Sequence, residues 1–72
     1  MDWTECPVIE VVPGRMSGAP VLRHSRVRPE DLLNNIEQTP EWMADAFDLP
    51  VEDVRAVLNF YHQHQSELAH TP

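Results

Sequence analysis

The chain contains no lysine, and its five basic residues are all arginines. Twelve aspartates and glutamates oppose them, which gives a formal net charge of −7 at pH 7. Binding to nucleic acid through phosphate contacts requires several cations on one face, because the affinity comes largely from counterion release. The shortage of positive charge therefore disfavours a protein whose surface is built mainly to hold DNA or RNA.

Two further absences limit where the protein works. Cys6 is the only cysteine, which excludes a disulfide within the chain and fits a reducing compartment. No stretch approaches the roughly 20 apolar residues of a membrane span, and the acidic start MDWTEC does not resemble a signal peptide. We therefore expect a cytoplasmic protein without membrane contact.

The first third of the chain is typical of a β-hairpin. The β-branched run VIEVV at 8–12 ends in Pro-Gly, which predicts a strand that enters a turn. The segments PVLR at 20–23 and RV at 26–27 predict the returning strand. Val8, Ile9, Val11 and Val12 place apolar groups on both faces of the first strand, so we expect cover from a second copy as well as from the rest of the chain.

A helical period follows. Pro29 with two acids behind it predicts a first helix over about 29–37, with Leu32, Leu33 and Ile36 as its apolar stripe. Thr39 before Pro40 predicts the capped start of a second helix. Apolar residues at 51, 54, 58 and 61 predict a third helix over about 50–65. The core candidates with helical spacing are Trp42, Met43, Phe47 and Tyr61.

These elements predict an α+β fold, mostly α. An N-terminal segment with a β-hairpin (1–28) precedes a homeodomain-like three-helix bundle (29–65) with a helix-turn-helix, and a flexible tail (66–72) completes a single domain. A chain of this length buries only about 60% of its unfolded surface, so partners or self-association commonly stabilise it.

Charge is divided unevenly along the chain. Residues 1–29 carry four arginines and three acids, whereas residues 30–72 carry nine acids and Arg55 alone. Such asymmetry bears on partners rather than on fold. We expect the first part to build a docking and dimer surface, with Trp3 as an anchor outside any periodic element. The residues assigned to that surface are Arg15, Arg23, Arg26, Arg28 and Trp3. At least one arginine is also expected to pair with a carboxylate inside the chain.

Catalytic and metal-binding patterns are weak. His62 and His64 point about 200° apart on a helix and cannot share an ion. Cys6 with His24 would be a nucleophile pair, but a lone thiol near the chain start is far more often inert. PGRMSG has neither the spacing nor the lysine of a phosphate loop. We expect no enzyme activity, no metal and no cofactor.

DNA binding is the main alternative, because a trihelical domain reads DNA with its third helix. The exposed positions expected there include Glu52, Asp53 and His62, together with Arg55, Asn59 and Gln63 as candidate base or phosphate contacts. Two acids at the start of that helix oppose phosphate binding. DNA binding by the isolated chain is therefore expected to be weak or absent.

The sequence resembles the small bacterial family catalogued as domain of unknown function 433, whose members are similar to antitoxins of the VapB type. The family pattern is a strand, Gly-x-Pro-Val-Ile-Arg-Gly-Thr-Arg-Ile, a helix, a Gly-x-(Ser/Thr)-x-Glu turn, and Leu-x-x-(Glu/Asp)-(Asp/Glu)-(Val/Ile)-x-x-Ala-Leu-x-Tyr. The matching residues are Gly18, Pro20, Val21, Leu22, Arg23, Arg26, Val27, Thr39, Leu49, Glu52, Asp53, Val54, Ala56 and Tyr61.

Two positions depart from this pattern. His24-Ser25-Arg26 stands where the family has Gly-Thr-Arg, so a histidine must adopt a backbone geometry that glycine eases. Glu37-Gln38 stands where a glycine precedes the second helix.

The resemblance implies a hairpin with a homeodomain-like fold and pairing, in a toxin–antitoxin operon, with a toxin similar to PIN-domain ribonucleases. We therefore expect an antitoxin-like protein that binds and neutralises such a ribonuclease, as a homodimer. The alternatives are a DNA-binding regulator that controls its own operator and an adaptor for some other protein.

Overall fold

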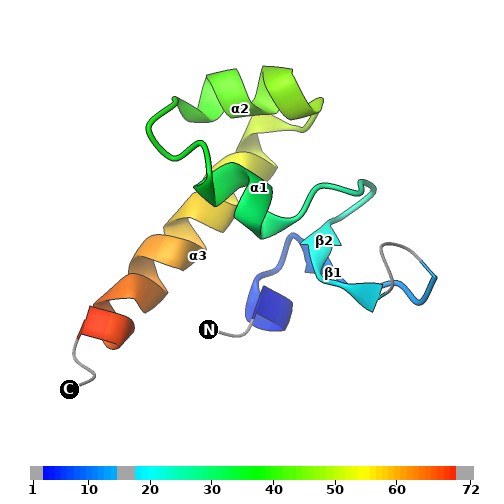
Figure 1. The fold of residues 1–72 in the computed structure, drawn as a ribbon, viewed down its shortest axis with the longest axis horizontal. Coiled ribbons are helices and arrows are strands. Elements are labelled where there is room, and N and C mark those ends of the chain that lie inside the picture. The colour runs from blue at the N-terminus through cyan, green and yellow to red at the C-terminus, as the bar shows by residue number, and fades with distance from the viewer. Residues whose placement is uncertain (1–2, 15–17, 70–72) are drawn as a thin grey trace.

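A computed structural model describes residues 3–14 and 18–69, with side chains described up to 64. The elements run η1 (Trp3–Glu5), β1 (Ile9–Glu10), β2 (Val21–Leu22), α1 (Pro29–Leu33), α2 (Pro40–Phe47) and α3 (Val51–Ala69) (Figure 1). The protein is thus α+β and mostly α, with an N-terminal hairpin before three helices. This confirms the fold class expected from the sequence.

The two strands form a short antiparallel pair in which Ile9 faces Leu22 and Glu10 faces Val21. Val8 and Ile9 are buried, whereas Val11 is 46% exposed. The regular pairing covers two residues in each strand, much less than the predicted 8–12 and 20–23. The hairpin is held instead by its contacts with the helices beside it (Figure 1).

Helix α1 ends at Leu33, short of the predicted 37. Pro29 occupies its first turn, and the Asp31 carboxylate accepts a hydrogen bond from the Arg28 backbone N–H at 3.0 Å. Asn34 and Asn35 follow, and the Asn35 side-chain amide donates to the Asp31 carbonyl at 2.9 Å. Asparagine competes in this way with helical hydrogen bonding, so the chain passes into turns.

Helix α2 begins as predicted. Thr39 is the N-cap, and its hydroxyl accepts a hydrogen bond from the Trp42 backbone N–H at 3.0 Å. Asp48 ends the helix in the left-handed conformation with φ 55°, and the Leu49 N–H donates to the Ala44 carbonyl. The turn at 48–50 then leads directly into α3.

Helix α3 continues to Ala69, beyond the predicted end near 65, and so includes residues 66–69 of the segment expected as a tail. Neither glycine nor proline interrupts residues 51–69, and nothing in the backbone stops the helix there. The predicted tail residues 70–72 lie outside the described part of the chain. In Figure 1 the last turns of α3 extend past the other elements.

The core lies where the hairpin, α1 and α2 meet the first half of α3. Its buried residues are Cys6, Val8, Ile9, Leu22, Leu32, Met43, Leu49, Val54, Val57 and Phe60. Met43 is confirmed as core, and Phe47 and Tyr61 are half-buried. Trp42 and Ile36 were expected to pack inward but are 45% and 42% exposed. Met43 and Phe47 take the inner side of α2, and Ile36 lies in turns where helical spacing no longer applies.

No helix in the described part of the chain is long and apolar enough to span a bilayer.

Candidate protein-binding site

A charged contact fixes the hairpin to the third helix. The Arg23 guanidinium donates two hydrogen bonds to the Asp53 carboxylate, from Nε to Oδ2 at 3.1 Å and from Nη2 to Oδ1 at 2.9 Å. This fork geometry is the strongest form of an arginine–carboxylate pair. The hydrogen bond to Asp53 and the Asp53 charge raise the pKa of Arg23. The expected internal arginine–carboxylate pair is confirmed.

The two partners differ in exposure, because the Asp53 side chain is 3% exposed and that of Arg23 46%. The prediction that Asp53 is an exposed position of α3 is therefore wrong. Residues 53, 57 and 60 share one helical face, and Val57 and Phe60 are core residues. Helical spacing therefore predicts that Asp53 faces the core. Acidic residues are common in the first turn of a helix, and that preference alone predicts an exposed Asp53. It does not predict the ion pair with Arg23.

The loop between β2 and α1 is tightly organised. The Ser25 N–H donates to the Leu22 carbonyl at 3.1 Å, and the Leu22 N–H donates to the Val27 carbonyl at 2.8 Å. The Ser25 hydroxyl also donates to the Leu22 carbonyl, and it accepts a hydrogen bond from the Val27 N–H. These bonds fix the backbone of the loop between Leu22 and Val27.

His24 lies in this loop with φ 61°, a backbone conformation that favours glycine. Its N–H donates to the Glu10 carboxylate at 2.9 Å, which helps to hold the turn. The expectation that a histidine adopts the geometry of the glycine in the family pattern is confirmed.

His24→Gly should raise the free energy of unfolding by about 0.5–1 kcal/mol, because relief of a left-handed side chain exceeds the entropy cost of glycine. Chemical denaturation followed by circular dichroism measures the change. Arg26→Gly is the control, since Arg26 has no positive φ and glycine there should lower stability. A loss of stability in His24→Gly similar to that in the control would contradict the account of strain.

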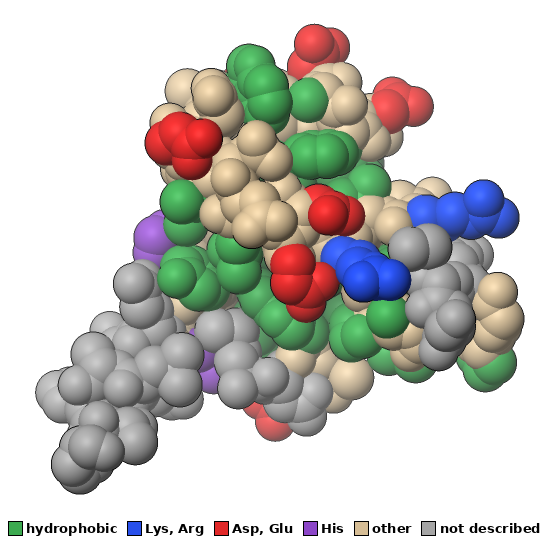
Figure 2. All heavy atoms as spheres, in the orientation of Figure 1, with side chains coloured by type: hydrophobic (Ala, Val, Ile, Leu, Met, Phe, Trp, Pro, Cys, Tyr) green, Lys and Arg blue, Asp and Glu red, His purple; other side chains and the backbone are tan. Residues whose placement is uncertain are grey.

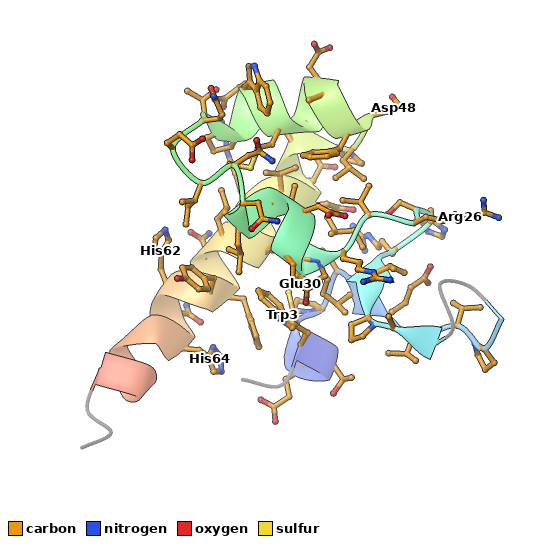
Figure 3. All side chains as sticks on the ribbon, in the orientation of Figure 1. Trp3, Arg26, Glu30, Asp48, His62 and His64 are labelled. Carbon is orange, nitrogen blue, oxygen red and sulfur yellow. The ribbon has the colours of Figure 1, made fainter. Side chains whose placement is uncertain are left out.

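Arg26 and Arg28 remain available on the surface. Both side chains are exposed and make no ion pair with any residue that the structure describes. Figure 3 shows Arg26 pointing away from the body of the molecule. Arg15, assigned to the same surface, lies outside the described residues. The predicted docking surface thus has two exposed arginines beside Arg23, and its role in binding stays a prediction.

Trp3 is half-buried rather than fully exposed. Its ring lies 5.4 Å from that of Phe60, between centroids, and packs against the core. Figure 3 shows it between η1 and α3. Trp3 therefore joins the N-terminal segment to the third helix, and any part in docking would use only the remaining ring surface.

The helical half presents an acidic surface. Its exposed carboxylates are Glu30, Glu37, Glu41, Asp45, Asp48 and Glu52. Arg55, the one cation of this half, pairs with Glu41 across α2 and α3. The pKa of Glu41 is lowered, first by a hydrogen bond from its own backbone N–H and then by Arg55. Much of this surface is therefore negative and available to a positively charged partner.

The candidate DNA contacts Arg55, Asn59 and Gln63 are exposed, and their spacing of four places them along one side of α3. Arg55 is engaged by Glu41, however, and the exposed Glu52 stands one turn earlier. Phosphates would meet carboxylates along this stripe as well as the single arginine. The arrangement is poorly suited to the phosphate contacts that anchor a recognition helix.

Cys6 is buried, with 1% exposure. Burial raises the pKa of its thiol, so the nucleophilic thiolate is disfavoured. Figure 3 shows His62 and His64 on opposite sides of α3, and His64 stacks on Phe60 with ring centroids 4.1 Å apart. In the described part of the chain, His, Cys, Asp and Glu form no group of three or more that could hold a metal ion.

One family model, described as "Protein of unknown function (DUF433)", matches residues 9–61, from the hairpin through most of α3. The match covers well over half of the chain and includes Arg23, His24 and Asp53, so the chain belongs to this family. No curated protein and no solved structure matches the chain.

Proposed function

We propose that this member of the DUF433 family is an antitoxin-like protein that binds and neutralises a basic, PIN-like ribonuclease toxin. One observation carries the proposal: six exposed carboxylates lie on the helical half, whose one arginine is paired with Glu41. A ribonuclease must attract RNA phosphates, so its substrate surface is positively charged. An acidic partner complements such a surface and competes with RNA for it.

Association with the toxin is the test. The probe is the purified product of the adjacent reading frame, mixed with the full chain in stopped flow at several salt concentrations. Electrostatic steering predicts that the association rate constant falls at least about tenfold between low and high salt. A complex whose association rate is independent of salt would overturn the electrostatic basis, and absence of a complex would overturn the proposal.

The same surface argues against operator binding by the isolated chain. Arg26 and Arg28 are exposed cations on the loop before α1, but α3 presents Glu52 and the paired Arg55 where a recognition helix needs positive charge. A nanomolar, sequence-specific gel shift of the promoter fragment by the chain alone at physiological salt would make DNA binding the preferred function.

We also propose that the chain forms a dimer through its hairpin. No further strand among the described residues flanks β1, and Val11 directly after it is 46% exposed. An open strand edge with an apolar side chain favours pairing with a second copy. Light scattering at tens of micromolar should therefore give twice the mass of one chain.

Val11→Asp should halve that mass, because the new charge would be buried at the paired edge. Gln38→Asp adds the same charge at an exposed position outside the hairpin and should leave the dimer intact. A wild-type chain that stays monomeric, or equal masses of the two variants, would contradict a dimer that pairs through the hairpin.

A further inference from the structure

The outer side of α2 combines a large apolar side chain with carboxylates. Trp42 is 45% exposed, and Asp45 and Ala46 follow it by three and four residues, which makes them its neighbours on the helix surface. Both are exposed, as is Glu41 beside them. We call these four residues, Glu41, Trp42, Asp45 and Ala46, the Trp42 face.

Packing of the fold does not account for the Trp42 face. The core side of α2 is made by Met43, Ala44 and Phe47, and Trp42 is not among the side chains packed against the core. In Figure 2 red and green side chains lie side by side at the top of the molecule, where Figure 1 places α2. Ile36, in the turns before α2, is a second large apolar side chain with 42% exposure. A half-exposed tryptophan is a typical energetic anchor of an interface.

The charges around Trp42 determine which occupant fits. Glu41 is already paired with Arg55, so Asp45 carries the negative charge of this face. A second copy would bring Asp45 against its own equivalent, and nucleic acids or anionic lipids would meet the same repulsion. A cationic protein segment meets attraction instead. Arginine is the best match, because its guanidinium stacks on an indole and forms paired hydrogen bonds with a carboxylate. The Asp45 side chain makes no ion pair with the residues that the structure describes.

We propose that the Trp42 face docks a basic, amphipathic helical segment of a protein partner. Apolar side chains and an arginine of the segment pack on Trp42, Asp45 pairs with a second cation, and small Ala46 lets the segment approach closely. This deepens the proposed function and rests on it for the partner's identity, since it names the face through which the acidic half would hold the toxin.

The first experiment uses a defined probe, a synthetic helical peptide with leucines on one face and arginines on the other. It is titrated into the full-length Trp3→Phe variant, which keeps an aromatic ring against Phe60 and leaves Trp42 as the only fluorophore of its kind. Binding should shift the Trp42 emission to shorter wavelength and protect it from iodide quenching. An analogue with glutamate in place of arginine should cause neither change. An unchanged emission at saturation would overturn the proposal.

Matched variants separate local docking from general attraction between a cation and an acidic protein. Trp42→Ala should weaken peptide binding, measured by calorimetry, at least about tenfold. His62→Ala removes an exposed ring from α3 and should change the affinity less than about twofold. Asp45→Asn should weaken binding more than Glu5→Gln, which removes the same charge from η1. Equal effects within either pair would contradict docking at this face.

Binding measurements with the toxin test docking at the Trp42 face separately from the antitoxin role. If the adjacent gene product binds the wild-type chain and Trp42→Ala binds it equally well, the Trp42 face is wrong and the antitoxin role stands. If that product does not bind but the peptide binds at Trp42, the antitoxin role is wrong and the docking face stands.

Discussion

Arg23→Ala should lower the melting temperature by roughly 10 °C, more than the removal of any other arginine. The substitution leaves the Asp53 carboxylate, 3% exposed, without its cation at the junction of hairpin and α3. A buried charge that has lost its partner is among the most destabilising defects in a small domain. Loss of this contact should also loosen the hairpin, because the short β1–β2 pairing alone is too small to hold it.

A double-mutant cycle tests the pair by thermal unfolding. Asp53→Ala should cost less than Arg23→Ala, since it leaves a half-exposed arginine that water can solvate, and the double variant should be no less stable than Arg23→Ala. Arg28→Ala is the matched control, because Arg28 is exposed and unpaired among the described residues, and should shift the melting temperature by less than about 4 °C. Equal effects of Arg23→Ala and Arg28→Ala would show that the contact contributes nothing.

Neutralising two carboxylates of the acidic helical half should slow toxin binding roughly tenfold at low salt. The variant is Asp45→Asn with Asp48→Asn, and asparagine suits the left-handed backbone of residue 48 at the end of α2. Local charge beside the Trp42 face steers the encounter, so its removal should lower the association rate constant more than it raises the dissociation rate constant. Stopped-flow mixing with the adjacent gene product measures both.

The control removes equal charge elsewhere. Asp2→Asn with Glu5→Gln takes the same two negative charges from the N-terminal segment and should alter the association rate constant less than about threefold. If both double variants slow binding to the same extent, attraction depends on net charge alone and the acidic helical half has no special part in it.

The sequence predicts the main elements because strong local signals mark them. Pro13-Gly14 marks the turn after the first strand, Thr39 caps α2 before Pro40, and Pro50 directly precedes α3. The backbone of His24 was also predictable, since glycine stands at that position in the family pattern and φ is positive here. In each of these cases neighbouring residues alone determine the local backbone, so the sequence is enough to predict it.

The errors arise where a contact with another segment decides the outcome. Helical spacing predicts Trp42 in the core, yet Met43 and Phe47 fill the inner side of α2 and Trp42 is 45% exposed. The preference of acids for first turns predicts Asp53 on the surface, whereas Arg23, thirty residues earlier, pairs with it in the interior. Periodicity alone does not reveal which of two adjacent residues faces the core or which charge is matched across the fold.

Neutralisation of the toxin is measured by its cleavage of a fluorescent RNA in the presence of increasing amounts of the full chain. Cleavage by the adjacent gene product should fall to background near one chain per toxin at low salt, and Trp42→Ala should need a clear excess to reach the same inhibition. Undiminished cleavage in the presence of a large excess of the wild-type chain would contradict the antitoxin role.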